Sequence, residues 1–255
     1  MKAGLVSVSF RKLSAREVVD LTVASGLSSL EWGGDLHVPH GDLETAREVA
    51  KMTGEGGLAV RAYGSYYRVG ESVAAGLSFA SVLDTAVALG APTIRVWAGK
   101  KSSAESGPAD REAVAVDALR VAAMAQEAGV IVAYEYHANT LTDTAESTRA
   151  LLAATDHPAI QCLWQPAVGL SMEETLVTLD VVMDRLSHVH AYYWGETGRD
   201  RFPLADGRER WRRYLAPIRA AGHDPDVLLE FVPGDDPEVL PRESEALREL
   251  LAEED

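Results

Sequence analysis

The chain alternates short runs of β-branched and apolar residues with longer amphipathic stretches along its whole length. The apolar runs suit buried strands, and the stretches between them repeat their apolar residues with the 3.6-residue period of a helix. The expected strands are residues 4–10, 29–32, 58–64, 93–99, 130–137, 160–165, 187–194 and 226–232. The clearest helical stretches are residues 15–24, 44–52, 73–89, 111–128 and 206–220.

Helix start and stop signals agree with this alternation. Ser14 with Glu17, and Ser171 with Glu174, have the spacing of a capping box. Glycines stand where helices would end, at Gly26, Gly90, Gly129 and Gly222. Parallel βα units in this number, with no linker between them, predict a single (β/α)8 TIM barrel domain over residues 1–255. An open doubly wound sheet is the alternative, but the glycine-rich dinucleotide fingerprint is missing after the first strand.

Charge and composition narrow the classes of partner. The formal net charge is −15, which opposes binding to a nucleic-acid backbone. There is no apolar run long enough for a transmembrane helix, and the first residues make a poor signal peptide. Cys162, the single cysteine, lies in an apolar run and is expected to be a buried hydrophobe. We therefore expect a cytoplasmic protein without nucleic-acid or membrane partners; the oligomeric state stays open, with a homodimer among the options.

Acidic and imidazole side chains fall at the ends of several expected strands. In "VIVAYEYHANT" (130–140) an apolar run turns polar at Glu135, and His190 and Glu230 end two later strands. A buried carboxylate is costly unless something pairs with it, and active sites of such barrels lie at these strand ends. Each group could instead be structural, with His188 and His190 as satisfied core histidines and Glu230 paired with Arg95. Three such groups at the same end of separate strands favour a divalent cation held by O and N ligands.

Five segments, in this order and spacing, resemble the xylose isomerase-like TIM barrels. This family includes sugar and sugar-phosphate isomerases and epimerases, inosose dehydratase and apurinic-site endonucleases. The resemblance covers nearly the whole chain and rests on "LEWGGDLHVP" (30–39), "TIRVWAG" (93–99), "YEYHANTLTDT" (134–144), "HVHAYYW" (188–194) and "LLEFV" (228–232). Epimerase-type members hold one divalent ion with Glu, Asp, His and Glu from strands 5 to 8. By motif, these ligands become Glu135, the strand-6 position, His190 and Glu230.

The strand-6 position departs from the family pattern. "LWQPAVG" places Gln165 where the family usually has Asp. An amide oxygen can ligate the ion but brings no charge, which should weaken metal affinity and make the ion a stronger Lewis acid. Alternatively, Gln165 hydrogen-bonds substrate and a water completes the shell. The resemblance thus implies one Mn²⁺, Mg²⁺, Co²⁺ or Zn²⁺ ion at Glu135, Gln165, His190 and Glu230.

Aromatic and polar side chains near the strand ends suggest a sugar or polyol ligand. Aromatic faces suit the CH face of a sugar or cyclitol, and His, Asn and Arg can hold its hydroxyls, although the tryptophans could equally be packing residues. The expected substrate-binding residues are Trp32, His37, His137, Asn139, Trp164, His188, Trp194, Arg199 and Arg201.

The expected catalytic residues are Glu135 and Glu230, on opposite sides of the ion. One carboxylate could remove a proton and the other return it, giving epimerisation through an enediolate. Return to the neighbouring carbon gives isomerisation, and loss of a β-hydroxyl gives dehydration. We expect a metal-dependent isomerase or epimerase; a dehydratase or lyase and a non-catalytic sugar-binding barrel remain alternatives. A DNA endonuclease is disfavoured, because the Asp-x-x-His expected on strand 6 is Gln165 and Val168 here.

Overall fold

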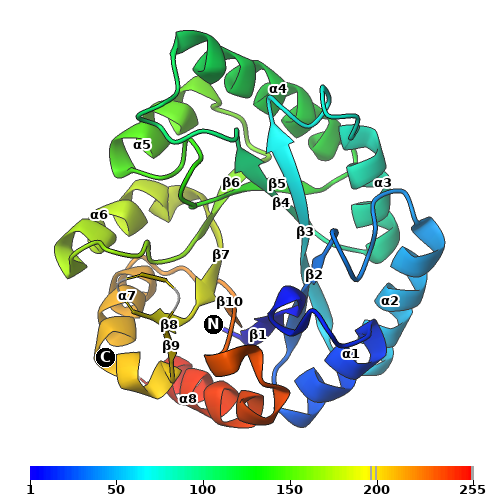
Figure 1. The fold of residues 1–255 in the computed structure, drawn as a ribbon, viewed down its shortest axis with the longest axis vertical. Helices are drawn as coiled ribbons and strands as arrows, with labels where there is room; N and C mark the ends of the chain where they lie inside the picture. The colour runs from blue at the N-terminus through cyan, green and yellow to red at the C-terminus, as the bar shows by residue number, and fades with distance from the viewer. Residues whose placement is uncertain (196, 199, 254–255) are drawn as a thin grey trace.

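Across the described residues, 1–195, 197–198 and 200–253, the computed structural model is a closed barrel of eight parallel strands (Figure 1). The barrel strands are β1 (Ala3–Val6), β2 (Ser29–Gly33), β3 (Ala59–Val69), β4 (Thr93–Ala98), β5 (Ile131–Glu135), β6 (Ile160–Trp164), β7 (Leu186–Ala191) and β10 (Val227–Leu229). Each strand pairs with the next in this order, and β10 closes the barrel onto β1. The TIM barrel prediction is confirmed, and the open doubly wound sheet is wrong because no gap separates β1 from β10.

Helices surround the barrel on its outside (Figure 1). They are α1 (Ala15–Ala24), α2 (Leu43–Glu55), α3 (Phe79–Leu89), α4 (Pro108–Glu127), α5 (Ala145–Ala154), α6 (Met172–Val182), α7 (Arg208–Ala220) and α8 (Leu240–Ala252). Short 3-10 helices are η1 (Ser7–Phe10), η2 (Met183–Arg185), η3 (Leu204–Gly207), η4 (Pro233–Asp235) and η5 (Pro237–Val239). Both predicted capping boxes form, at the starts of α1 and α6. The four predicted end glycines all have positive φ.

Three strand ends differ from the sequence prediction. Residues 7–10 form η1 instead of continuing β1. β3 runs on to Val69 through a register shift between Gly64 and Tyr67. The seventh predicted strand divides into β7 and β8 (Tyr193–Trp194), and β8 pairs antiparallel with β9 (Arg201–Phe202). In each case the change begins at the carboxyl end of a barrel strand, where loops replace the ladder.

The barrel has two interiors of opposite character. Between strands and helices lies the main apolar core, which includes three fully buried tryptophans, Trp32, Trp164 and Trp211. Inside the barrel the apolar cluster is small, namely Val6, Val8 and Leu228 with Tyr66 and Phe231 against it. Most of the remaining space inside is filled by charged and imidazole side chains, so the chemistry of this chain is concentrated along the barrel axis.

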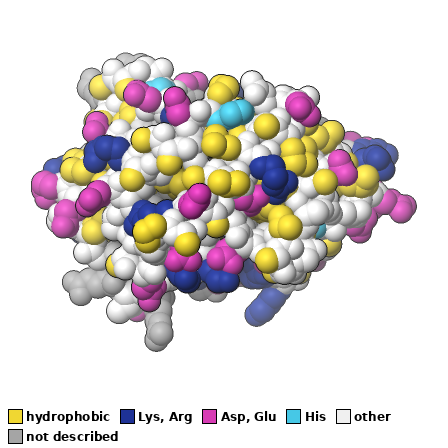
Figure 2. Space-filling view, turned by 90° about the horizontal axis from the view of Figure 1, so that it is seen from above, with side chains coloured by type: hydrophobic (Ala, Val, Ile, Leu, Met, Phe, Trp, Pro, Cys, Tyr) yellow, Lys and Arg dark blue, Asp and Glu magenta, His cyan; other side chains and the backbone are white. Residues whose placement is uncertain are grey.

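Three further observations concern the surface, the lengths of the helices and the single cysteine. On the face seen in Figure 2, acidic, basic and hydrophobic side chains are intermixed. No helix in the described part of the chain is long and apolar enough to cross a bilayer. Cys162 is buried as predicted, and burial raises the pKa of its thiol to about 12.

Candidate metal centre

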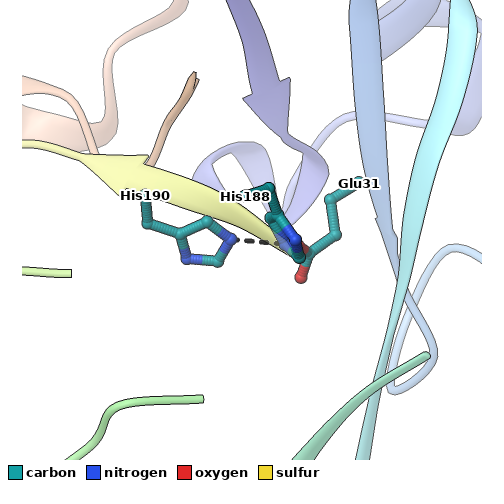
Figure 3. A group of neighbouring side chains, drawn as sticks. All are labelled: Glu31, His188 and His190. Carbon is teal, nitrogen blue, oxygen red and sulfur yellow. Dashed lines mark hydrogen bonds and ion pairs between the residues drawn. The ribbon is translucent and has the colours of Figure 1, made fainter. Parts of the chain in front are cut away.

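A column of polar side chains runs along the inside of the barrel. The polar column comprises Glu31, Arg95, Glu135, His188, His190 and Glu230, and none of them is more than 6% exposed. They come from β2, β4, β5, β7 and the end of β10. Because residues two apart on a strand share a face, His188 and His190 both point inward. Figure 3 shows the two rings turned toward the carboxylate of Glu31 on the facing strand.

Glu31, Arg95 and His188 form what we call the lower part of the column, and both carboxylate oxygens of Glu31 have partners there. Its Oε1 accepts from Nε of Arg95 at 2.5 Å, and its Oε2 lies 3.0 Å from Nε2 of His188 and 2.9 Å from Nε2 of His190. Nδ1 of His188 is 2.9 Å from Oγ of Ser187. Burial alone would raise the pKa of Glu31, but Arg95 and His190 outweigh it and hold that pKa well below its usual range. Burial lowers the pKa of His188 to about 4, so this ring is neutral.

A glycine makes room for the ion pair between Glu31 and Arg95. A Cβ at Gly64 on β3 would lie 2.5 Å from Nη2 of Arg95 and 2.8 Å from Oε1 of Glu31. Both separations are shorter than a carbon atom tolerates, so any side chain at this position would displace the pair. The guanidinium of Arg95 also lies over the ring of Tyr66, 4.8 Å from its centroid.

Glu135, His190 and Glu230 form what we call the upper part of the column, and Glu135 is surrounded by hydrogen-bond donors. Arg95 and Trp97 donate to its Oε2, and Nε2 of Gln165 donates to its Oε1 at 3.0 Å. Nε2 of Gln165 also lies 3.0 Å from the carbonyl oxygen of Tyr136. Burial alone would raise the pKa of Glu135, but the nearby positive charge of Arg95 outweighs it and the pKa is lowered. This carboxylate is therefore held as an anion.

Two buried atoms beside Glu135 have no hydrogen-bond partner among the described residues: Nδ1 of His190 and Oε1 of Gln165. Nδ1 of His190 is 3.3 Å from Oε2 of Glu230, close but without hydrogen-bond geometry. One ligand atom each from Glu135, His190 and Glu230 lie within 4.8 Å of one another. Unsatisfied buried polar atoms are rare, and those at this point are the atom types that coordinate divalent cations.

The charge of the column also fits a divalent cation. Three buried carboxylates, Glu31, Glu135 and Glu230, face one buried guanidinium, so two negative charges are left over. Without a metal, a proton partly replaces the missing charge. Burial lowers the pKa of His190, but Glu230 and Glu31 outweigh burial and raise it to about 10. Because Nε2 of His190 is committed to Glu31, Nδ1 is the atom presented to an ion, the arrangement in which a carboxylate orients a metal-binding histidine.

A second group of three, Glu31, His188 and His190, also has ligand atoms within 4.8 Å of one another. Its facing atoms already bond to one another, and Arg95 neutralises Glu31. We therefore place the candidate metal centre at Glu135, His190 and Glu230, with Oε1 of Gln165 beside it.

A cavity of about 390 Å³ opens onto this centre. Glu135, Gln165 and Glu230 form part of its wall, as do His137, Asn139, Trp194 and Phe231. His137 stacks on Trp97 with ring centroids 4.9 Å apart, and Trp194 stacks on Tyr192 at 3.9 Å. Three of the residues expected to bind substrate, His137, Asn139 and Trp194, thus line a space next to the metal centre.

Trp32 and Trp164 were expected at the mouth, and this prediction is wrong. Nε1 of Trp32 donates to Oγ1 of Thr53 in α2, and Nε1 of Trp164 donates to Oγ1 of Thr178 in α6. Each tryptophan is next in sequence to a residue that faces inward, so strand alternation turns it outward to the helices. They are packing residues.

The prediction for His37 and His188 is also wrong. The ring nitrogens of His37 lie 3.1 Å from Oγ of Ser7 and 3.1 Å from the carbonyl oxygen of Leu13, and the ring does not line the cavity. His188 has both nitrogens occupied below the metal centre.

The two arginines of the loop after β7 have different outcomes. Arg201 forms an ion pair with Asp235, and its guanidinium lies 4.5 Å from the ring centroid of the cavity residue Phe231. Arg199 lies outside the described residues.

Sequence reasoning did not assign a role to Glu31, and it considered Arg95 only as an alternative structural partner of Glu230. The structure instead pairs Arg95 with Glu31 and Glu135. A signal was available, because "TIRVWAG" places a guanidinium in the middle of an otherwise apolar strand. Such a charge must meet an opposite charge inside the barrel.

Comparison with known proteins agrees with this architecture. The sequence model of a family described as xylose isomerase-like TIM barrel matches residues 19–250. No curated protein matches the sequence. A solved structure of a probable 3-DHS dehydratase from Bacillus anthracis superposes with a TM-score of 0.82 at 20% identity, covering 97% of this chain and 99% of that one.

Two further solved structures have the same fold. A D-allulose 3-epimerase from Methylomonas sp. gives a TM-score of 0.75 at 14% identity, with 98% of each chain covered. A xylose isomerase-like TIM barrel protein from Mycobacterium smegmatis, in complex with magnesium, gives 0.76 at 15% identity, with 98% of this chain and 96% of that one covered. The match to the family model spans most of the chain, and the chain therefore belongs to the xylose isomerase-like TIM barrel family.

Proposed function

We propose that this protein is a divalent-metal-dependent enzyme that moves a proton on a sugar or related polyol, as an isomerase or epimerase. The observation that carries the proposal is the pair of unpartnered atoms, Nδ1 of His190 and Oε1 of Gln165, beside two carboxylates at the floor of a cavity. The names of fold neighbours, an allulose epimerase and a dehydratase among them, support chemistry on polyoxygenated small molecules.

In this proposal Glu135, His190 and Glu230 hold the ion, and Oε1 of Gln165 takes the fourth protein position. When bound, a divalent ion supplies Lewis-acid polarisation of the substrate's oxygens. His137, Asn139 and Trp194 contact the substrate in the cavity, with Trp194 presenting an aromatic face to its CH groups.

The two glutamates have unequal surroundings, and this divides their roles. Both oxygens of Glu135 already accept hydrogen bonds, two of them from Arg95 and Trp97. The carboxylate of Glu230 lies 3.3 Å from Nδ1 of His190, and no hydrogen bond to it is formed by the described residues. We therefore assign proton removal to Glu230 and keep Glu135 as a ligand that stays anionic. If Glu230 returns the proton to the neighbouring carbon, the outcome is isomerisation; epimerisation needs a second acid on the opposite face.

A dehydratase is the second candidate, and His137 is the observation that favours it. Its ring lines the cavity and stacks on Trp97 at an interplanar angle of 29°, with Nδ1 2.6 Å from the carbonyl oxygen of Ala138. The carbonyl fixes Nδ1 as a donor, so Nε2 is the atom left to exchange a proton with a leaving hydroxyl.

The test combines metal binding with solvent-isotope exchange. Protein treated with a chelator is titrated with Mn²⁺ by calorimetry, and the loaded protein is incubated in D₂O with ketoses, their phosphates and inososes. We expect one Mn²⁺ per chain and deuterium incorporation at carbon in at least one compound, both lost in Glu230→Gln. Isomerisation retains the substrate's formula, whereas dehydration shows a mass loss of water. A wild-type protein that binds no divalent ion would contradict the proposal.

A further inference from the structure

A second cavity lies beside the one at the metal centre and is nearly twice its size, about 720 Å³. It is bounded by the loop after β6, the β8–β9 hairpin and α7. Trp194 and Val168 line both cavities, together with Ala167, Leu170 and Tyr192. The two spaces are therefore neighbours that share a wall, and Trp194 belongs to that wall.

Aromatic side chains form much of the lining of the second cavity, and Tyr193, Trp194 and Phe202 are the ones that are partly open to solvent. Tyr193, Trp194, Phe202, Trp211 and Tyr214 line it. Phe202 is 44% exposed and Val168 is 40% exposed, so two apolar side chains are left in water at its edge. Nε1 of Trp194 is buried and has no hydrogen-bond partner in the described part of the chain. Exposed apolar groups gathered around a hollow mark a binding site more often than simple surface.

Polar groups are interleaved with these faces. Residues 166–171 of the loop after β6 line the cavity, and so does Arg210 on α7. Arg210 is exposed and forms no ion pair with the described residues, whereas Arg213, one turn further on, contacts Glu173. Aromatic side chains combined with the unpartnered Nε1 of Trp194 and the exposed guanidinium of Arg210 suit a ring that has both CH faces and hydroxyls.

We propose that the second cavity is a subsite for a second sugar-like ring, so that the substrate is a glycoside or disaccharide-sized molecule and not a free monosaccharide. This rests on the proposed function, which places the reacting ring over the metal centre. Ligand pockets typically span about 300–1,000 Å³, and the cavity at the metal centre is near the low end of that range. The second ring, bonded to the reacting ring at the metal centre, would lie beyond Val168 and Trp194 and stack on the aromatic side chains of the second cavity.

The experiment compares monosaccharides with their disaccharides by tryptophan fluorescence on the full chain loaded with Mn²⁺. The panel pairs glucose with maltose and cellobiose, galactose with lactose, and xylose with xylobiose. We expect at least one disaccharide to bind ten or more times tighter than either of its monosaccharides. Phe202→Ala and Arg210→Ala should each reduce that ratio at least threefold. The matched controls, Val177→Ala on the exposed face of α6 and Arg213→Ala on α7, should leave it unchanged.

Absence of any disaccharide preference across the panel would overturn the subsite, and so would a preference that survives Phe202→Ala. The binding measurements need no turnover, so they test the subsite independently of the proposed reaction. A disaccharide preference without turnover of any compound would retain the subsite and reject the proposed reaction. Turnover of monosaccharides without a disaccharide preference would retain the proposed reaction and reject the subsite.

Discussion

The lower and upper parts of the polar column use the same residue types, but they differ in how completely their atoms are partnered. Around Glu31, each carboxylate oxygen and both nitrogens of His188 meet a protein group. Around Glu135, two buried atoms meet none. The difference teaches how to separate structural from functional charge in one barrel: a saturated group of buried charges stabilises the closed barrel, and an unsaturated one is built for a ligand.

The largest expected effect comes from removing the cation that both parts share. Arg95→Met leaves Glu31 and Glu135 buried without their main counter-charge, and breaking a buried pair in this way costs about 3–5 kcal/mol. We expect the free energy of unfolding in urea to fall by about that amount.

The control is Arg120→Met, which removes an arginine that pairs with Asp117 on the partly exposed face of α4. Such a pair contributes about 0–1 kcal/mol. Equal losses in the two variants would mean that Arg95 is not the electrostatic centre of the column.

The next largest effect is a loss of stability at low pH, which we expect from His188 in the lower part of the column. His188 has a pKa of about 4 in the fold against about 6.5 in an unfolded chain, so the unfolded chain binds more protons between these values. The contribution of His188 to the free energy of unfolding is therefore complete above pH 6.5. It is lost as the pH falls toward 4, by about 3 kcal/mol in all. Urea unfolding at pH 7, 5.5 and 4 measures this loss, and His188→Gln should flatten the slope. An unchanged slope in that variant would assign acid sensitivity to other groups.

A smaller effect tests whether the lower part orients the upper part. Glu31→Gln weakens the bond that commits Nε2 of His190, and loss of such an orienting carboxylate lowers metal affinity about 10–100-fold. Calorimetric titration with Mn²⁺ measures the change. Glu243→Gln is the matched control, because Glu243 is also buried but accepts from the main chain of Leu204 and has no contact with the column among its hydrogen bonds and ion pairs. If both variants lose affinity equally, the effect is general destabilisation and not orientation.

The smallest effect is expected at the fourth position. Gln165→Asp adds a negative charge beside the ion but removes the donor to Glu135. Since the two changes partly offset each other, we expect Mn²⁺ affinity to rise only a few fold, by the balance of charge gain against a lost hydrogen bond. The same titration measures it, and unchanged or weaker affinity would show that this side chain does not reach the metal.

Much of the fold followed from local patterns in the sequence. The capping boxes at Ser14 and Ser171 and the helix over residues 15–24 depend on neighbours a few positions away, and the structure confirms them. The ends of the strands were less accurate. Where β1 gives way to η1 and where β3 continues through its register shift depends on contacts with other strands, which local patterns do not contain.

The site was predicted where a residue's own strand set its direction, and missed where a distant partner did. Glu135, His190 and Glu230 fell together as expected. The tryptophans were misplaced because Glu31 and Trp32, as adjacent residues, cannot both face the barrel axis. That rule was available from the sequence alone. The pairing of Arg95 with Glu31, 64 residues away, was not, since several carboxylates could have met that guanidinium.

The bonds from Glu31 to the two histidines join residues 157 and 159 positions apart in the chain. A slip of β7 by one residue against its neighbours would turn both rings toward the helices, because side chains alternate along a strand. Such a slip would leave the carboxylate of Glu31 with Arg95 as its one remaining partner. Val189 would then face the barrel axis where the histidine rings had been. An apolar interior would tolerate this exchange, but a charged one does not. The buried charges of the column therefore favour the correct register of β7, because a barrel closed with β7 out of register would leave Glu31 buried without its histidine partners.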